Sequence, residues 1–194
     1  FEGTNILCNN ISLSSVAFKF GISEEQVKTI LEQSAQKLLE TRAKRIPPGL
    51  DDKILTSWDS LMISAFAKGY RISNEKKYLA AAENCIKFIQ EKLLKNDQLL
   101  RTYKNGLAKI PGYLEDYAFF VNSLLDVFEI KPDSEYLGLA KTLSTHLIEH
   151  FWDSKQNCFF MTADNHENLI IRPKSTHDLS LPSGNSVAAN TLLR

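Results

Sequence analysis

The sequence predicts a mainly α-helical protein, built as a stack of αα-hairpins with short β-ribbons between the hairpins. Three observations support this fold class. Glycine and proline together contribute only 14 of the 194 residues, which favours long uninterrupted helices. Segments that are apolar on most of their circumference alternate with amphipathic ones, as expected of inner helices covered by outer ones. This pair of segments recurs with a period near sixty residues, which is typical of repeat architectures.

The first half of the chain contains three of the expected helices. A capping-box pattern, Ser23-Glu24-Glu25-Gln26, opens a helix over about residues 23–44, because the first and last of these residues can satisfy each other's amide groups. A Pro-Pro-Gly run at 47–49 ends it. Residues 55–73 are apolar nearly all round and predict an inner helix, whereas residues 75–94 are amphipathic and predict an outer one.

The pair of helices then repeats. Residues 114–130 predict a second apolar inner helix, and Ser134 is expected to cap a second amphipathic helix. The expected inward residues of that helix are Leu137, Ala140, Leu143, Leu147 and Ile148. A third apolar helix begins at Ser183. Equivalent positions at Trp58, Tyr117 and Ser183 are therefore 59 and 66 residues apart.

The connections between hairpins have the alternating pattern of strands. Residues 99–103 and 107–110 flank Asn105-Gly106, which is a strong signal for a tight hairpin turn. Residues 158–161 and 169–172 flank a polar turn in the same manner. We therefore expect a short β-ribbon after each outer helix.

Composition excludes several function classes. The chain has 23 basic and 23 acidic residues, which argues against a nucleic-acid partner and against a polybasic membrane anchor. No apolar stretch approaches the ~18 residues of a membrane-spanning helix. Cys8, Cys85 and Cys158 are far apart, so neither a zinc site nor a disulfide framework is indicated. We expect free thiols in a reducing, cytoplasmic compartment, with no metal and no cofactor. The chain starts without Met and stops within an expected helix, which suggests a fragment of a longer protein.

Four motifs together carry a resemblance to a known family. They are Asp51-Asp52-Lys53-Ile54-Leu55-Thr56-Ser57-Trp58, Leu114-Glu115-Asp116-Tyr117-Ala118-Phe119, Phe151-Trp152-Asp153 and Pro182-Ser183-Gly184-Asn185-Ser186. In this order and spacing the chain resembles the YyaL / spermatogenesis-associated protein 20 family, and the opening residues 1–7 fit it as well. One departure is Trp58-Asp59-Ser60, where the family usually has Trp-Asn-Gly.

The resemblance implies a toroid similar to the six-hairpin (α/α)6 folds of glycosidases and N-acylglucosamine 2-epimerases. Residues 1–194 would be a middle fragment of this one domain, about two and a half of its hairpins. The family also has an N-terminal thioredoxin-like domain of the DUF255 type, which would lie upstream and is absent from this chain. We expect it to be an intramolecular partner in the full-length protein.

In such a toroid the loops that enter the inner helices gather at one mouth of the central cavity. Polar and aromatic residues lie in all three of these loops. The expected catalytic residues are Asp52, Glu115, Asp116 and His177. The expected substrate-binding residues are Asp51, Lys53, Trp58, Tyr113, Tyr117, Arg172, Asp178 and Asn185. Carboxylates can serve as general acid and base, and aromatic rings can stack on sugar faces.

Each of these residues also has a structural interpretation. Asp52 and Asp116 lie near helix N-termini, where carboxylates are favoured as caps. Trp58 and Tyr117 fit a hydrophobic core at least as well as a sugar site. His177 is a candidate proton carrier or a residue that orders its loop.

Five further polar residues belong to the same question. Ser183 fits a helix N-cap better than a nucleophile, because the Gly-x-Ser-x-Gly pattern is absent. His146 and His150 are expected to be surface histidines on an outer helix rather than metal ligands. Arg101 is either a charge at a strand edge or a residue lining the cavity, and Lys174 lies in the third loop.

Two functions are compatible with this pattern. The first is a carbohydrate-active or carbohydrate-binding toroid, which acts on a small sugar or polyol by metal-independent carboxylate acid/base chemistry. The alternative is a non-catalytic scaffold or partner-binding module for the attached thioredoxin-like domain. Side chains that share one open cavity would favour the first function, and side chains consumed as caps and ion pairs would favour the second.

Overall fold

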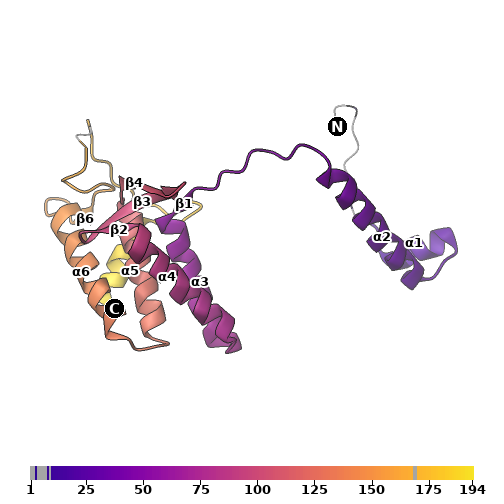
Figure 1. Ribbon diagram of the computed structural model, residues 1–194, viewed down its shortest axis with the longest axis horizontal. Helices are drawn as coiled ribbons and strands as arrows, with labels where there is room; N and C mark the ends of the chain where they lie inside the picture. The colour runs from indigo at the N-terminus through magenta and orange to yellow at the C-terminus, as the bar shows by residue number, and fades with distance from the viewer. Residues whose placement is uncertain (1–2, 4–7, 9, 168–169) are drawn as a thin grey trace. The chain divides into compact units, whose positions relative to one another are not determined.

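Inner and outer helices alternate along the chain in the computed structural model, which describes residues 3, 8, 10–167 and 170–194 (Figure 1). The chain divides into two compact units, Phe1–Asp51 and Asp52–Arg194. The expectation that residues 1–194 form part of one toroid domain stays a prediction. None of the described helices is long and apolar enough to cross a membrane.

The first unit contains helices α1 (Leu13–Phe20) and α2 (Glu24–Ala43). The predicted capping box of α2 is confirmed, because the Gln26 N–H donates to Ser23 Oγ and the Ser23 N–H donates to Gln26 Oε1. Helix α1 has only eight residues and was not predicted. It is capped by Ser12 and ends at Gly21 in the left-handed conformation that favours glycine.

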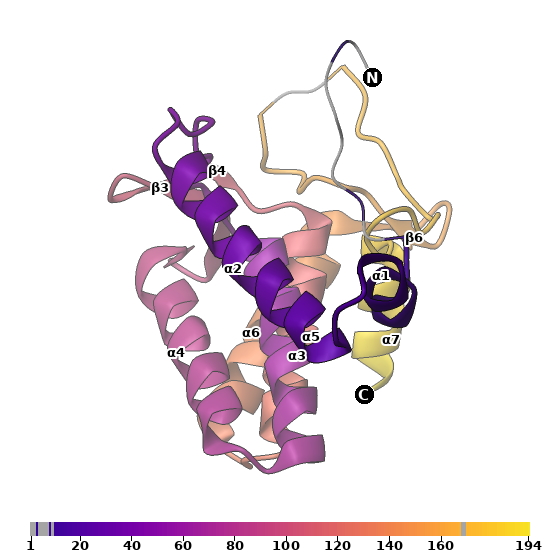
Figure 2. The ribbon, with the colours of Figure 1, turned by 90° about the vertical axis from the view of Figure 1, so that its right-hand side faces the viewer.

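The second unit contains the two inner–outer pairs and the third inner helix. Its helices are α3 (Thr56–Ser73), α4 (Lys76–Lys92), α5 (Leu114–Phe128), α6 (Ser134–Phe151) and α7 (Gly184–Leu193). Helix α5 packs between α3 and α7, while α4 covers α3 and α6 covers α5 (Figure 1 and Figure 2). The predicted mainly α fold of repeated αα-hairpins is therefore confirmed.

The hydrophobic core lies where α5 meets the two outer helices. Its largest fully buried side chains include Phe119, Phe120, Leu124 and Val127 of α5, Ile86 and Ile89 of α4, and Leu143 and Leu147 of α6. Apolar residues on one face of α4 and of α6 are buried in this core, as their amphipathic patterns predict.

Three details of the helices differ from the expectation. Helix α3 is not buried all round, because it exposes Trp58, Met62 and Ile72. Ile148 was expected to face inward and is 47% exposed. Asp133 caps α6 in place of the expected Ser134, since Asp133 Oδ1 accepts the Glu135 N–H at 3.0 Å, and aspartate is among the preferred N-cap residues.

A four-stranded antiparallel sheet lies at the end of the second unit where the inner helices begin. Its strands are β1 (Ile54–Leu55), β2 (Leu94–Lys95), β3 (Gln98–Lys104) and β4 (Leu107–Pro111), and β3 pairs with each of the others. Asn105 and Gly106 both have positive φ, 52° and 79°, as a two-residue hairpin turn requires. The first predicted β-ribbon is thus confirmed.

The second predicted ribbon forms with a different partner. Strand β6 (Cys158–Phe159) pairs with β5 (Trp152–Asp153). Of the expected partner 169–172, residues 170–172 are not a strand and residue 169 lies outside the described residues. Residues 170–172 are instead anchored by the side chain of Arg172, which donates hydrogen bonds to the carbonyl oxygens of Thr162 and His150.

Candidate functional site

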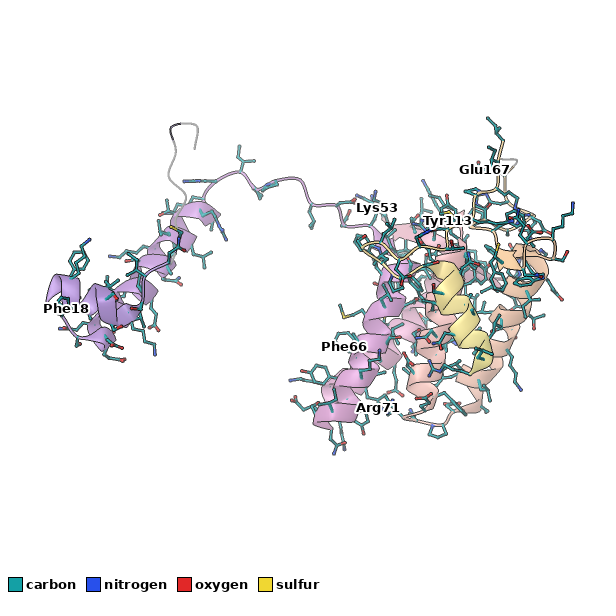
Figure 3. The ribbon with its side chains drawn as sticks, turned by 180° about the vertical axis from the view of Figure 1, so that it is seen from behind. Phe18, Lys53, Phe66, Arg71, Tyr113 and Glu167 are labelled. Carbon is teal, nitrogen blue, oxygen red and sulfur yellow. The ribbon has the colours of Figure 1, made fainter. Side chains whose placement is uncertain are left out.

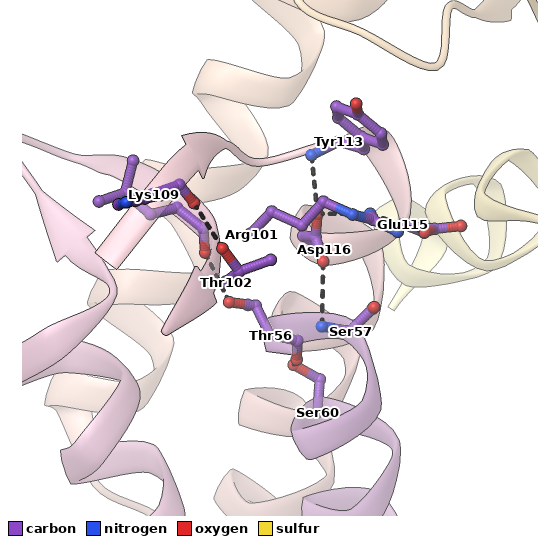
Figure 4. A network of polar contacts seen from close by, with 10 residues as sticks. Thr56, Ser57, Ser60, Arg101, Thr102, Lys109, Tyr113, Glu115 and Asp116 are labelled. Carbon is purple, nitrogen blue, oxygen red and sulfur yellow. Dashed lines mark hydrogen bonds and ion pairs between the residues drawn. The ribbon is translucent and has the colours of Figure 1, made fainter. Parts of the chain in front are cut away.

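The N-termini of α3 and α5 are joined by a single buried carboxylate, that of Asp116 (Figure 4). Asp116 Oδ2 accepts the Tyr113 N–H at 2.8 Å, and Oδ1 accepts the Ser57 N–H at 3.0 Å. Helix α3 has no side-chain cap of its own, so Asp116 supplies one from the neighbouring repeat. Free amide groups at a helix N-terminus attract a negative charge. Asp116 therefore acts as a cap for two helices at once.

Arg101 on β3 completes this network. Its Nη1 lies 3.1 Å from Asp116 Oδ2 and 2.8 Å from Glu115 Oε1, and its guanidinium carbon lies 4.4 Å from the centre of the Tyr113 ring. Arg101 thus forms ion pairs with two carboxylates and a cation–π contact with one aromatic ring. The sequence left open whether Arg101 was a strand-edge charge. The structure makes it a half-buried bridge at the start of α5.

The environment of Asp116 sets its proton affinity. Its side chain is fully buried, and this loss of hydration raises the pKa of Asp116 to about 6. The Arg101 guanidinium and the Tyr113 N–H act in the opposite direction and lower the pKa. The hydrogen bonds and the ion pair of the Asp116 carboxylate are all made with protein groups, and its side chain has no exposure to solvent.

A cavity of about 220 Å³ lies between the N-termini of α5 and α7. Tyr113 and Glu115 reach it from α5, and His177 reaches it from the loop before α7. The other residues around it are Leu114, Met161, Ser175, Leu179, Ser180, Leu181, Pro182, Ser183 and Gly184. The predicted convergence of the second and third loops is therefore seen at this cavity, for three of the named site residues.

The loop that forms the wall of this cavity is fixed by two hydrogen bonds of Ser183, the N-cap residue of α7. Asp178 Oδ1 accepts the Ser183 N–H at 2.7 Å, and the Ser183 hydroxyl donates to the carbonyl oxygen of Ser175 at 2.9 Å. Ser183 is thus the N-cap residue of α7, and its hydroxyl is bound to a carbonyl rather than to a base. Asp178 orders the loop and does not itself line the cavity.

Gly184 allows α7 to approach α5 closely. A Cβ atom at this position would lie 3.0 Å from Leu114 Cγ and 3.3 Å from the Glu115 backbone nitrogen, both shorter than normal van der Waals contact. The width of the cavity therefore depends on a glycine at the first residue of α7.

The residues predicted from the first loop lie elsewhere. The Asp52 carboxylate forms an ion pair with Lys104 at 2.5 Å, beside the turn that joins β3 to β4. Lys53 is exposed, and Trp58 is 60% exposed on α3. Neither these three residues nor Asp51, which ends the first compact unit, lines the cavity. The pairing of β1 with β3 carries this segment toward the hairpin turn.

Two further predicted residues form structural contacts. Tyr117 is 2% exposed, and its hydroxyl oxygen accepts the Leu99 N–H at 2.9 Å, so it is a core residue. Asn185 Oδ1 accepts the Phe159 N–H at 2.7 Å, while its amide nitrogen donates to the carbonyl oxygens of Phe159 and Ser175. Asn185 therefore fastens β6 to the start of α7.

Arg172 and Lys174 hold the third loop in place. The Arg172 guanidinium donates to the Thr162 and His150 carbonyl oxygens and stacks on Phe160, 4.1 Å from the ring centre. Lys174 forms an ion pair with Asp153. Both side chains are consumed by these contacts, and neither lines the cavity.

The paired histidines on α6 are not simple surface residues. The His146 ring stacks on Tyr117 with the ring centres 5.0 Å apart, and the His150 ring is 4.4 Å from that of His146. His150 Nδ1 lies 2.8 Å from Asp164 Oδ1. Burial and the neighbouring His150 lower the pKa of His146. Over the residues described, no cluster of three or more His, Cys, Asp or Glu side chains could hold a metal ion.

Asp59, the departure from the family pattern, lies away from the cavity against α4. Burial raises the pKa of Asp59, and a hydrogen bond with Cys85 acts in the opposite direction. Burial of the Cys85 thiol, together with the charge of Asp59, raises the pKa of this thiol to about 12. Cys85 is therefore an unreactive thiol in a partly buried contact between α3 and α4.

Sequence reasoning missed several residues of the cavity wall. Ser175, Met161 and Leu181 carry no motif of their own, and they reach the cavity because backbone contacts fold the third loop over the start of α5. The Leu114 N–H donates to the Met161 carbonyl oxygen at 2.9 Å, and the Met161 N–H donates to the Pro173 carbonyl oxygen at 2.8 Å. The one signal in this part of the sequence is Leu181, directly before the Pro-Ser-Gly-Asn motif, which is half-buried at the cavity.

No model of a known protein family matches the chain. Its fold resembles that of a cellobiose 2-epimerase from Spirochaeta thermophila, with a TM-score of 0.60 and 18% identity over 73% of this chain and 38% of that one. It also resembles a family 105 glycoside hydrolase from C. acetobutylicum, with a TM-score of 0.59 and 14% identity over 93% of this chain and 54% of that one. These likenesses define the class of fold, an α/α toroid.

The sequence comparison identifies the nearer relatives. The chain is 34% identical to spermatogenesis-associated protein 20 of Homo sapiens across 204 aligned positions, and 31% identical to an uncharacterized protein of Caenorhabditis elegans across 201. Both alignments include the whole of this chain but only 26% and 27% of the relatives. The chain thus spans about a quarter of their length. The resemblance predicted from the four motifs is confirmed.

Proposed function

We propose that the cavity between α5 and α7 is a binding site for a sugar or similar polyol within an α/α toroid. The observation that carries this proposal is the meeting of Tyr113, Glu115 and His177 at one cavity. They come from two separate loops at the N-terminal ends of neighbouring inner helices. The chain has the same class of fold as sugar epimerases and glycoside hydrolases, and this analogy supports a sugar as the ligand.

The three side chains suit the recognition of a polyol. The Tyr113 ring offers an apolar face, and the Arg101 guanidinium behind it fixes its orientation. Glu115 is bound to Arg101 through Oε1, and within the described part of the chain its second oxygen has no hydrogen-bond donor. That oxygen can accept hydrogen bonds from ligand hydroxyl groups.

The finer proposal concerns acid/base chemistry. Of the four residues predicted to be catalytic, only Glu115 and His177 line the cavity. We assign Glu115 the role of proton acceptor, because it presents a carboxylate oxygen, and His177 the role of proton carrier, because one imidazole nitrogen can accept a proton while the other donates one. We leave Asp116 and Asp52 out of this pair, because neither lines the cavity and both carboxylates are bound by protein groups.

One observation favours the non-catalytic alternative. Asp116 and Asp52, two of the predicted catalytic carboxylates, are engaged in a double helix cap and an ion pair. A toroid that binds a ligand or an attached domain without transforming it needs no pair of free carboxylates.

Calorimetric titration with neutral mono- and disaccharides, followed by analysis of products, tests the proposal. Glu115→Gln is expected to reduce sugar affinity at least tenfold, while the control Glu149→Gln, on the exposed side of α6, leaves it unchanged. Circular dichroism checks that each variant is folded. Unchanged affinity in Glu115→Gln would contradict the proposed site. Binding that persists without any product would favour the non-catalytic alternative.

A further inference from the structure

A second cavity, of about 320 Å³, lies between α3, α5 and α7. The residues that line it are Leu61, Ser64, Ala65, Lys68, Phe119, Asn122, Pro182, Val187 and Asn190. They come from one face of each inner helix, and four of them carry polar side chains. No role was predicted for any of these four from the sequence.

The two cavities follow one another along the same side of the inner helices. Pro182 lines both of them. On α5, Glu115 borders the first cavity while Phe119 and Asn122 border the second, and positions i, i+4 and i+7 share a helix face. At 1.5 Å per residue, Glu115 and Asn122 are about 10 Å apart along the axis. Figure 3 shows the direction of this path, with Tyr113 at the end of the unit near the strands and Arg71 toward the opposite end of α3.

The second cavity carries an uncompensated positive charge. Lys68 is exposed, and it forms no hydrogen bond or ion pair with any residue that the structure describes. The nearest acidic neighbour of Asn122 is Asp126, which is already paired with Arg194 at 2.8 Å. A lysine left without a carboxylate partner beside a cavity favours the binding of an anion.

Neutral donors accompany this charge. Asn122 Nδ2 donates to Asp126 Oδ2 at 3.1 Å and to Ser64 Oγ at 3.5 Å. Among the residues that the structure describes, the Ser64 hydroxyl proton has no acceptor of its own. Asn190 on α7 is exposed at the cavity. Within the described residues the cavity thus offers the Lys68 ammonium and the Ser64 hydroxyl from α3 and the Asn190 amide from α7. Carboxylates and phosphates prefer such a set of donors.

We propose that the second cavity is a subsite for an anionic group, a carboxylate or a phosphate, on a sugar whose neutral ring occupies the first cavity. The inference rests on the proposed function, because the first cavity must bind the ring. The axial separation of about 10 Å indicates a ligand longer than one ring, such as an acidic disaccharide. Lys68 is a specificity-determining residue in this arrangement, and it has no part in the proton transfer assigned to Glu115.

Matched pairs of disaccharides test the subsite by calorimetry on the whole chain. Trehalose is compared with trehalose 6-phosphate, and cellobiose with cellobiouronic acid. At least one acidic member is expected to bind about tenfold more tightly than its neutral counterpart, as one charge-assisted hydrogen bond predicts. A preference in only the first or only the second pair identifies the anion as phosphate or carboxylate.

Lys68→Gln is expected to abolish this preference and leave the affinity for the neutral member unchanged. The control Lys141→Gln removes an equally exposed lysine from α6 and is expected to keep the preference. Equal binding of neutral and acidic members would overturn the subsite and leave the proposed function standing. A preference that survives Lys68→Gln would also overturn it. If neither member of either pair binds the unmodified chain, the proposed function fails and the subsite falls with it.

Discussion

Replacing Asp116 by asparagine tests whether this carboxylate serves architecture rather than chemistry. The amide has the same shape, but it offers one acceptor oxygen where the carboxylate has two. In one orientation its NH2 group faces the Ser57 N–H, and in the other it faces the Tyr113 N–H and Arg101. Either way at least one buried donor loses its acceptor.

The structure sets the magnitude of this effect. A buried donor left without a partner costs about 1–3 kcal/mol, and the weakened contact with Arg101 adds to it. The lower cost of burying a neutral amide offsets part of the loss. We therefore expect a destabilisation of about 2–4 kcal/mol. For a unit of this size that is a fall in Tm of about 6–12 °C.

Thermal unfolding followed by circular dichroism at pH 8, where the Asp116 carboxyl group is ionised, measures the effect. The control is Asp52→Asn, which removes a carboxylate from an exposed ion pair and is expected to lower Tm by no more than about 3 °C. An Asp116→Asn variant as stable as this control would refute the assignment of Asp116 as a shared helix cap.

Three further predictions follow from contacts described above. Gly184→Ala is expected to lower both Tm and sugar affinity, because its methyl group would push α7 away from α5. The control Gly138→Ala places a methyl group in open space on α6. It should raise the free energy of unfolding, measured in urea, by about 0.5–1 kcal/mol. Tyr117→Phe should cost about 1–3 kcal/mol by the same measurement, since the Leu99 N–H loses its acceptor; a loss below 0.5 kcal/mol would argue against that hydrogen bond. The pKa of His146 is lowered in the folded chain, so the folded state binds this proton less tightly than the unfolded state does, and stability is lost as pH falls through the ordinary histidine range. His146→Gln should therefore show a smaller drop in Tm between pH 8 and pH 5.5 than the unmodified chain, and an equal drop would contradict the lowered pKa.

The helices could largely be predicted because their signals are local. Periodicity and capping residues set the bounds of α2, α4 and α5 to within a few residues, and Asn105-Gly106 predicted the hairpin turn. Helix α1 was missed because eight residues are too few for a clear period. The partner of β6 was missed because β5 is only two residues long, Trp152–Asp153, which is too short for an alternating pattern.

The candidate site was predictable only in part. A repeat of sixty residues placed Glu115 and His177 at the same end of neighbouring inner helices, and they line one cavity. The role of Asp116 could not be inferred, because a carboxylate in the first turn of a helix fits both a cap and a proton donor. What decides between them is Arg101, which comes from a strand fourteen to fifteen residues earlier. Asp52 lies away from the cavity because β1 pairs with β3, and the pattern of residues 51–58 does not reveal this pairing.

The double cap at Asp116 also bears on how the repeats unfold. In arrays of repeated hairpins, cooperativity comes from the interfaces between neighbours rather than from each hairpin alone. Here one side chain caps the N-termini of two consecutive inner helices, α3 and α5. Unfolding of α5 would therefore remove the side-chain cap of α3. Adjacent repeats are thereby coupled at their polar ends as well as through their hydrophobic faces, which favours joint unfolding of the two hairpins over unfolding of either one alone.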